Sequence, residues 1–257
     1  MSEELQLPSV EEVETHLAKG IEFLKEINID REYDKAFGFS NTLMHTCSAA
    51  LSTDHIFAAV ISNEVGLFHA RQGNFGYALF FLYSAIKFWQ KNPQQICEDT
   101  VNTYIYLGIT HTLDPAFALG KEMFMNAHRA LRVIKAEKSG KAAEVLCFEA
   151  ALYMTQDDWH TSLKLLQQSL DMLTELGIEK TYFKGECLLN MARIFRYQKK
   201  MMDALTYYQM SADAYSDYYE KGHLILDPIF EEWKNCLDAA KEEENGSEIL
   251  DYRSENN

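Results

Sequence analysis

The chain has 257 residues, of which 47% are hydrophobic and 25% charged, as in a soluble globular protein with one large domain or two small ones. Only 12 glycines and 4 prolines leave few positions for the turns of an all-β sandwich or barrel, so the composition favours helices. The net charge of −15 repels phosphate backbones and argues against a nucleic-acid partner.

Hydrophobic periodicity and turn signals predict a succession of paired helices. Ser9 and Glu12 have the spacing of a capping box, which opens the first helix. Asp114-Pro115 and Asp227-Pro228 each place a capping acid before a proline at the first helical position. The predicted hairpins pair 10–28 with 32–50, 55–72 with 75–90, 99–113 with 116–136, 141–156 with 159–176, and 182–198 with 201–220, and a last helix follows at 227–243.

The chain carries an internal repeat of 42 residues, the interval between Gly66 and Gly108. Residues 42 positions apart form columns of similar type. One column is nearly all small, and a second is small throughout. A third, three residues before the second, is mostly aromatic. Five small residues in five positions have chance odds of about one in a few thousand. The columns are Leu24, Gly66, Gly108, Ala150 and Ala192; Ala36, Ala78, Gly120, Ser162 and Ala204; and Tyr33, Phe75, Phe117, Trp159 and Met201.

These columns predict a stack of helix hairpins. Small residues at facing positions let two antiparallel helices approach closely, and an aromatic residue fills the wedge beside them. One hairpin cannot bury its own apolar face, so neighbouring repeats supply the core. We therefore expect an all-α, right-handed α-solenoid of about five hairpins with a C-terminal capping helix. It would form one superhelical domain over residues 1–243, followed by an acidic, disordered tail at 244–257.

The second repeat resembles the tetratricopeptide repeat (TPR). It has an aliphatic residue and glycine at Val65-Gly66, His69 four residues on from Val65, Gly73-Asn74-Phe75, and then Ala78, Leu82 and Ala85. The 42-residue unit is longer than the common form and is similar in length to the repeats of kinesin light chains and of the bacterial peptide-sensing Rap-type regulators. The resemblance covers roughly residues 10–220.

The resemblance implies that the first helix of each hairpin lines a concave groove that receives a protein or peptide segment. The groove would be apolar in its middle and basic at one end, where Arg193 and Arg196 share a helix face and clamp a carboxylate or phosphate. A competing interpretation places Ile105, Ile109 and Leu189 in the core and lets the two arginines balance nearby acids. The implied groove residues are Asn63, Leu67, Asn102, Ile105, Ile109, Cys147, Met154, Leu189, Asn190, Arg193 and Arg196.

Function is expected to be non-enzymatic, that of a scaffold or adaptor. The chain has no Gly-rich phosphate loop, no GxSxG and no HExxH, and its histidines lack metal spacing, so we predict no catalytic residues, metal or cofactor. An enzyme that uses Cys147 is a remote alternative. The second hypothesis is a Rap-type signalling regulator, with Asn63, Asn102 and Asn190 available to bind a peptide backbone.

An aromatic patch on the fourth predicted helix suggests self-association. Phe80, Phe81, Phe88 and Trp89 lie around more than one face of that helix, so they either pack on both sides within the stack or join two copies in a homodimer.

The sequence also predicts a cytoplasmic location without membrane insertion. Residues 1–8 contain neither a basic nor an apolar signal segment, and the uncharged stretch 72–86 is too short to span a bilayer. Five cysteines, an odd number without CxxC spacing, indicate reduced thiols.

Overall fold

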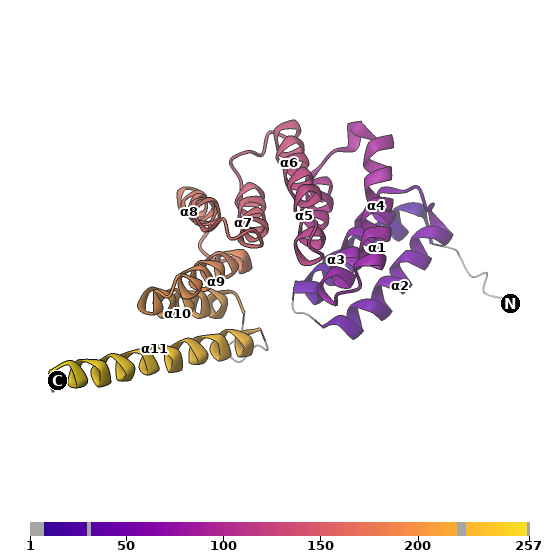
Figure 1. Ribbon diagram of the computed structural model, residues 1–257. Helices are drawn as coiled ribbons and strands as arrows, with labels where there is room; N and C mark the ends of the chain where they lie inside the picture. The colour runs from indigo at the N-terminus through magenta and orange to yellow at the C-terminus, as the bar shows by residue number, and fades with distance from the viewer. Residues whose placement is uncertain (1–7, 30–31, 220–224, 256–257) are drawn as a thin grey trace. The chain divides into compact units, whose positions relative to one another are not determined.

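The computed structural model describes residues 8–29, 32–219 and 225–255, and within these ranges the regular structure is helical, without a strand (Figure 1). The predicted all-α fold of paired helices is therefore confirmed. The chain divides into two compact units, Met1–Glu137 and Lys138–Asn257, which are described separately below. A single domain over residues 1–243 and its right-handed superhelical sense stay predictions.

Unit 1 consists of three helix hairpins. The first helices α1, α3 and α5 contact one another in sequence, and α2 and α4 each pack against the first helix of the following hairpin. A short 3-10 helix, Pro93–Gln95, precedes the third hairpin. The helices are α1 (Val10–Ile29) with α2 (Tyr33–Ala50), α3 (Ile56–Arg71) with α4 (Phe75–Lys91), and α5 (Glu98–Leu113) with α6 (Phe117–Val133).

Unit 2 has two hairpins and a long terminal helix. Its elements are α7 (Gly140–Met154) with α8 (Trp159–Glu175), α9 (Tyr182–Tyr197) with α10 (Met201–Tyr218), and α11 (Leu226–Glu255). Both α7 and α8 contact α9, and α11 packs on α10 (Figure 1). Ile229 and Cys236 of α11 are buried, so the first half of this helix closes the end of the hairpin stack, as expected of a capping helix.

The helices recur at a constant interval. The second helices of the five hairpins begin at Tyr33, Phe75, Phe117, Trp159 and Met201, each 42 residues after the previous one. The first helices α3, α5, α7 and α9 begin with the same spacing, at residues 56, 98, 140 and 182.

Small residues allow the two helices of a hairpin to approach closely. A Cβ atom added to Gly66 would lie 2.5 Å from Cγ of Leu82, and one added to Gly108 would lie 2.6 Å from Cζ of Phe124. In unit 2 the hydroxyl of Ser162 reaches the backbone of the partner helix and donates to the carbonyl of Ala150, 3.0 Å away. The two small columns of the sequence therefore mark helix contacts.

The predicted helix starts have mixed outcomes. The capping box is confirmed, because the backbone N–H of Ser9 donates to Oε2 of Glu12 and the backbone N–H of Glu12 donates to Oγ of Ser9. The Asp114-Pro115 start is wrong. Asp114 is the C-cap of α5 and donates its N–H to Thr110, and α6 begins only at Phe117.

The C-terminal segment also differs from expectation. Helix α11 begins at Leu226, so Asp227 and Pro228 lie inside its first turn, and it continues to Glu255. The backbone of residues 244–255 is therefore helical where the sequence predicts a disordered tail, and residues 256 and 257 lie outside the described residues.

Candidate functional site

Most of the predicted groove residues are buried. Helices α3 and α5 pack against neighbouring helices, and nearly all of their side chains are shielded from solvent. Ile105 and Cys147 are 0% exposed, so the prediction that they contact a partner is wrong. The structure buries Asn63, Leu67, Asn102, Ile105, Cys147, Leu189 and Asn190, half-buries Ile109, Met154 and Arg193, and exposes Arg196.

Asn63 is part of an internal hydrogen-bond network in unit 1. Its amide donates to the backbone carbonyl of Asp99, 2.9 Å away, and its Oδ1 lies 2.8 Å from the hydroxyl of Thr103. That hydroxyl accepts a hydrogen bond of 2.8 Å from the indole of Trp89. Because these partners satisfy a buried amide, Asn63 joins α3 to α5 and has no need of an external peptide.

Cys147 has the environment of a core thiol. It is fully buried and donates to the carbonyl of Phe183, 3.7 Å away. A hydrogen bond with Cys187 and burial raise the pKa of the Cys147 thiol well above its usual value. A buried, protonated thiol is not a nucleophile that a substrate can reach, so the enzyme hypothesis based on Cys147 is not supported.

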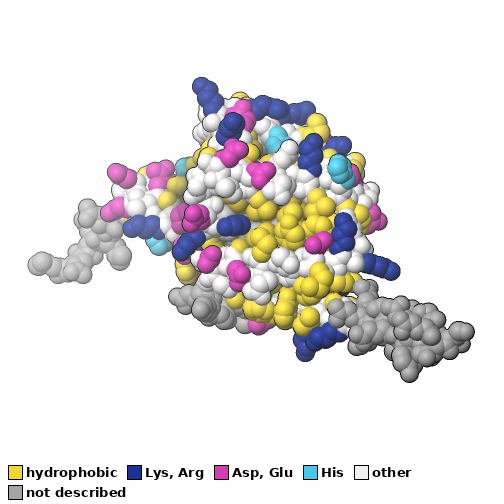
Figure 2. Space-filling model, turned by 90° about the vertical axis from the view of Figure 1, so that its left-hand side faces the viewer, with side chains coloured by type: hydrophobic (Ala, Val, Ile, Leu, Met, Phe, Trp, Pro, Cys, Tyr) yellow, Lys and Arg dark blue, Asp and Glu magenta, His cyan; other side chains and the backbone are white. Residues whose placement is uncertain are grey.

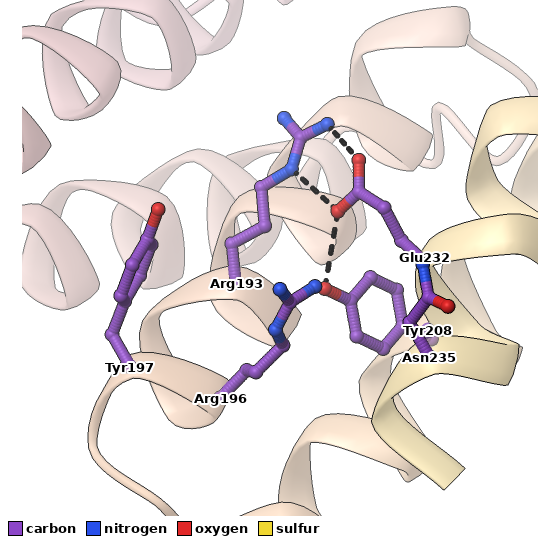
Figure 3. A pocket seen from close by; sticks show the side chains of 6 residues that line it. All are labelled: Arg193, Arg196, Tyr197, Tyr208, Glu232 and Asn235. Carbon is purple, nitrogen blue, oxygen red and sulfur yellow. Dashed lines mark hydrogen bonds and ion pairs between the residues drawn. The ribbon is translucent and has the colours of Figure 1, made fainter. Parts of the chain in front are cut away.

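Arg193 and Arg196 lie together at a pocket of about 320 Å³ in unit 2 (Figure 3). Both project from the last turns of α9, as their spacing of three predicts. Tyr197 follows them on the same helix, and its ring stacks on Trp159 with a centroid separation of 5.4 Å. The remaining lining residues are Tyr208 from α10 and Glu232 and Asn235 from α11.

The carboxylate of Glu232 is held by three hydrogen bonds. Arg193 donates from Nε to Oε2 at 3.0 Å and from Nη2 to Oε1, the two-pronged geometry that a guanidinium offers a carboxylate (Figure 3). The hydroxyl of Tyr208 donates to the same Oε2 at 3.1 Å. These hydrogen bonds join Arg193, Tyr208 and Glu232 into one network, and the guanidinium of Arg196 lies beside the Tyr208 hydroxyl (Figure 3).

The charges of this network support each other. Burial alone raises the pKa of Glu232, but the hydrogen bonds from Arg193 and Tyr208 outweigh it, and the net shift is downward. Burial and the neighbouring Glu232 charge raise the pKa of Tyr208 to about 12. At neutral pH Glu232 is therefore ionised, and Tyr208 is neutral and acts as a hydrogen-bond donor.

Tyr208, Glu232 and Asn235 were not predicted from the sequence. Glu232 follows Arg193 by 39 residues, and no local pattern connects the two. The only signal for Tyr208 is its place in the repeat, 16 residues after Ala192, where Phe124 stands after Gly108.

The predicted aromatic patch in unit 1 divides into two parts. Phe88 and Trp89 are buried in the core of unit 1, and Trp89 also donates to Thr103 of α5, so their predicted role in dimer contact is wrong. Phe80 is 65% exposed and joins Tyr77 and Phe81 around a shallow apolar hollow. The part of the patch that remains exposed, around Tyr77, Phe80 and Phe81, is therefore uncharged and aromatic.

Unit 2 has a second hollow, of about 440 Å³, between α8, α9 and α10. Leu170, Leu188 and Met210 contribute apolar surface, and Lys180 and Asp217 contribute charges of opposite sign. Figure 2 shows the left-hand side of the view in Figure 1, where hydrophobic side chains gather in areas bordered by charged ones. In contrast to the arginine pocket, this hollow has no dominant charge.

Two kinds of site are missing from the described part of the chain. Its Cys, His, Asp and Glu side chains include no group of three or more that could hold a metal ion. Among the same residues no helix has both the length and the apolar content needed to cross a bilayer.

Comparisons with known proteins agree with this architecture. Residues 141–217, which extend from α7 to near the end of α10, match the family model of the tetratricopeptide repeat. The whole chain is similar to a solved structure, BtubC (BKLC) from P. vanneervenii, with 14% sequence identity over 95% of this chain and 90% of that chain and a TM-score of 0.56. At this identity the likeness shows the fold alone. No curated protein matches the chain.

Proposed function

We propose that the protein is a non-enzymatic scaffold that binds a segment of another protein on the surface formed by α7 and α9, the first helices of the two hairpins in unit 2. Tetratricopeptide repeats generally mediate protein–protein interaction, and the match over residues 141–217 supports this role for unit 2. The observation that carries the proposal is the open pocket at the end of α9, where Arg193 and Arg196 border free volume.

The binding surface is narrower than the groove that the resemblance implies. Of the implied residues, Ile109, Met154, Arg193 and Arg196 keep accessible side-chain surface, and three of these four belong to unit 2. Met154 supplies apolar contact and Arg196 a cation, the combination that an amphipathic segment needs. We place the protein in the cytoplasm, as its reduced cysteines suggest.

A capture experiment with paired variants tests the scaffold proposal. Met154→Gln/Arg196→Glu alters the proposed surface, and Met202→Gln/Lys164→Glu makes the same chemical changes on the second helices of unit 2. Proteins captured from host lysate by the wild type and the second variant, but not by the first, support the proposal. Equal capture by both variants contradicts the location, and no capture by the wild type contradicts the function.

The Rap-type alternative, a regulator that binds a short peptide, makes a different prediction. Asn102 and Asn190 are each 7% exposed, so they would have to turn outward to bind a peptide backbone. A short peptide that binds them would raise the melting temperature of the protein in the absence of any protein partner.

Homodimer formation is a subsidiary proposal, supported by the exposed aromatic side chains of Tyr77 and Phe80. A dimer seen by analytical ultracentrifugation that becomes a monomer on Phe80→Ser substitution would support it. A monomer at every concentration would contradict it.

A further inference from the structure

Glu232 is an acidic side chain that is bound in the manner of a ligand. Arg193 holds it through two donors and Tyr208 through one, and the Arg193 and Glu232 side chains are 36% and 26% exposed. The cluster therefore shows how these three donors hold a carboxylate, and it does so at a position that solvent reaches.

Arg196 provides a second guanidinium whose charge is not balanced in the same way. Its guanidinium lies beside the neutral hydroxyl of Tyr208, and within the described part of the chain Glu232 acts on it electrostatically, without an ion pair like the one that Glu232 forms with Arg193. Its side chain is exposed and borders the open pocket together with the ring of Tyr197 and the amide of Asn235 (Figure 3). A guanidinium has five N–H donors, so Arg196 can bind a further carboxylate while it contacts Tyr208.

We propose that this pocket binds a carboxylate side chain from an acidic segment of the partner protein, and that Glu232 is an internal competitor that lowers its affinity. The proposal deepens the scaffold function and rests on it. A carboxylate bound at Arg196 would lie beside Glu232 and be repelled by its negative charge. Both carboxylates would be attracted to the positive charge of Arg193. Glu186 on α9 also acts on Arg193 electrostatically, so neutralising Glu232 removes part of the opposing charge and leaves the rest.

The charge of the whole chain makes this site selective. At −15 the protein repels acidic segments in general, so such a segment stays bound only where local cations outweigh the long-range field. Complementary charges at one place then fix the register of the bound segment more than they add to affinity.

A fluorescent hexaglutamate peptide with blocked ends serves as the probe, and binding is measured by fluorescence anisotropy at low ionic strength. We expect Glu232→Gln to bind the peptide about five-fold more tightly than the wild type, and Arg196→Gln to bind it at least about five-fold more weakly. Hexaglutamine is the neutral control and should not respond to either substitution.

Matched variants separate the local effect from a change in net charge. Glu231→Gln removes the same charge from an exposed neighbour on α11, and Arg132→Gln removes an exposed arginine from α6 in unit 1. Each control should change the dissociation constant less than about two-fold, because exposed charges at a distance are screened. Circular dichroism establishes that every variant is folded at the assay temperature.

Two results would overturn the proposal. Equal affinities of Glu232→Gln and Glu231→Gln would show that Glu232 does not compete, and equal affinities of Arg196→Gln and Arg132→Gln would show that the acidic probe binds elsewhere or not at all. The titration needs no partner protein, so its outcome is independent of the capture experiment. If the peptide binds as predicted but the capture experiment finds no partner protein, the carboxylate-binding site is supported and the scaffold role is refuted.

Discussion

Adding a methyl group at Gly108 tests the close approach of α5 and α6. A Cβ atom there would lie 2.6 Å from Cζ and 2.8 Å from Cε1 of Phe124, inside the separation at which carbon atoms repel. Phe124 is fully buried, and overpacking of this kind costs about 1–3 kcal/mol of the free energy of unfolding. Replacing glycine by alanine in a helix returns about 1 kcal/mol, so we expect Gly108→Ala to be destabilised by up to about 2 kcal/mol.

Gly38 in α2 is the matched control, because it is helical and exposed and a Cβ atom there would have no neighbour within 4 Å. Gly38→Ala gains helix propensity without overpacking, so it should be stabilised by about 0.5–1 kcal/mol. Urea unfolding followed by circular dichroism measures both changes. If Gly108→Ala is stabilised as much as Gly38→Ala, the helices are not in close contact there and the argument from small columns fails.

Three further predictions concern stability. Lys199 has a φ angle of 59°, so Lys199→Gly should stabilise the protein by about 0.5–1 kcal/mol in urea unfolding, and Lys200→Gly, at φ −92°, should not. The pKa of Glu232 is lowered from 4.5, so its ion pair stabilises the fold above pH 4.5 and the effect is lost as pH falls through the lower folded value. Glu232→Gln should therefore be less stable than the wild type by about 1 kcal/mol at pH 7, a figure reduced for solvent screening because Arg193 is 36% exposed. This difference in stability should disappear in acid. A difference that persists at pH 3 would contradict the ion-pair explanation. Burial lowers the pKa of His69 from 6.5, so the neutral side chain makes its full contribution to folding stability above pH 6.5, and this contribution is lost as pH falls. The melting temperature of His69→Phe should therefore fall less between pH 7 and pH 5 than that of the wild type. An equal fall in both proteins would refute a destabilising effect of His69 protonation.

The sequence predicted the helices well because the signals were local and repeated. The small and aromatic columns recur in chain order, and the second helices begin at the aromatic column itself, at Phe75, Phe117 and Trp159. Ser9 and Glu12 were correctly paired because a capping box depends on residues three apart.

The groove residues were harder to predict because α3 and α5 are buried on nearly every side. When a helix is apolar all round, residue spacing does not distinguish a ligand-binding face from an inter-helix contact. Asn63 illustrates this problem, since its partner Thr103 is 40 residues away and satisfies the amide inside the core. Glu232 was missed for a related reason, because its contact with Arg193 depends on how α11 packs.

Photo-crosslinking from the arginine pocket tests the central claim that a partner segment binds at the end of α9. A benzophenone amino acid replaces Tyr197, which is 70% exposed beside Arg196, or Tyr77, which is 66% exposed on α4. The captured partner should crosslink from position 197 and not from position 77. Crosslinking from position 77 alone would place the partner on the aromatic surface of unit 1 and contradict the account.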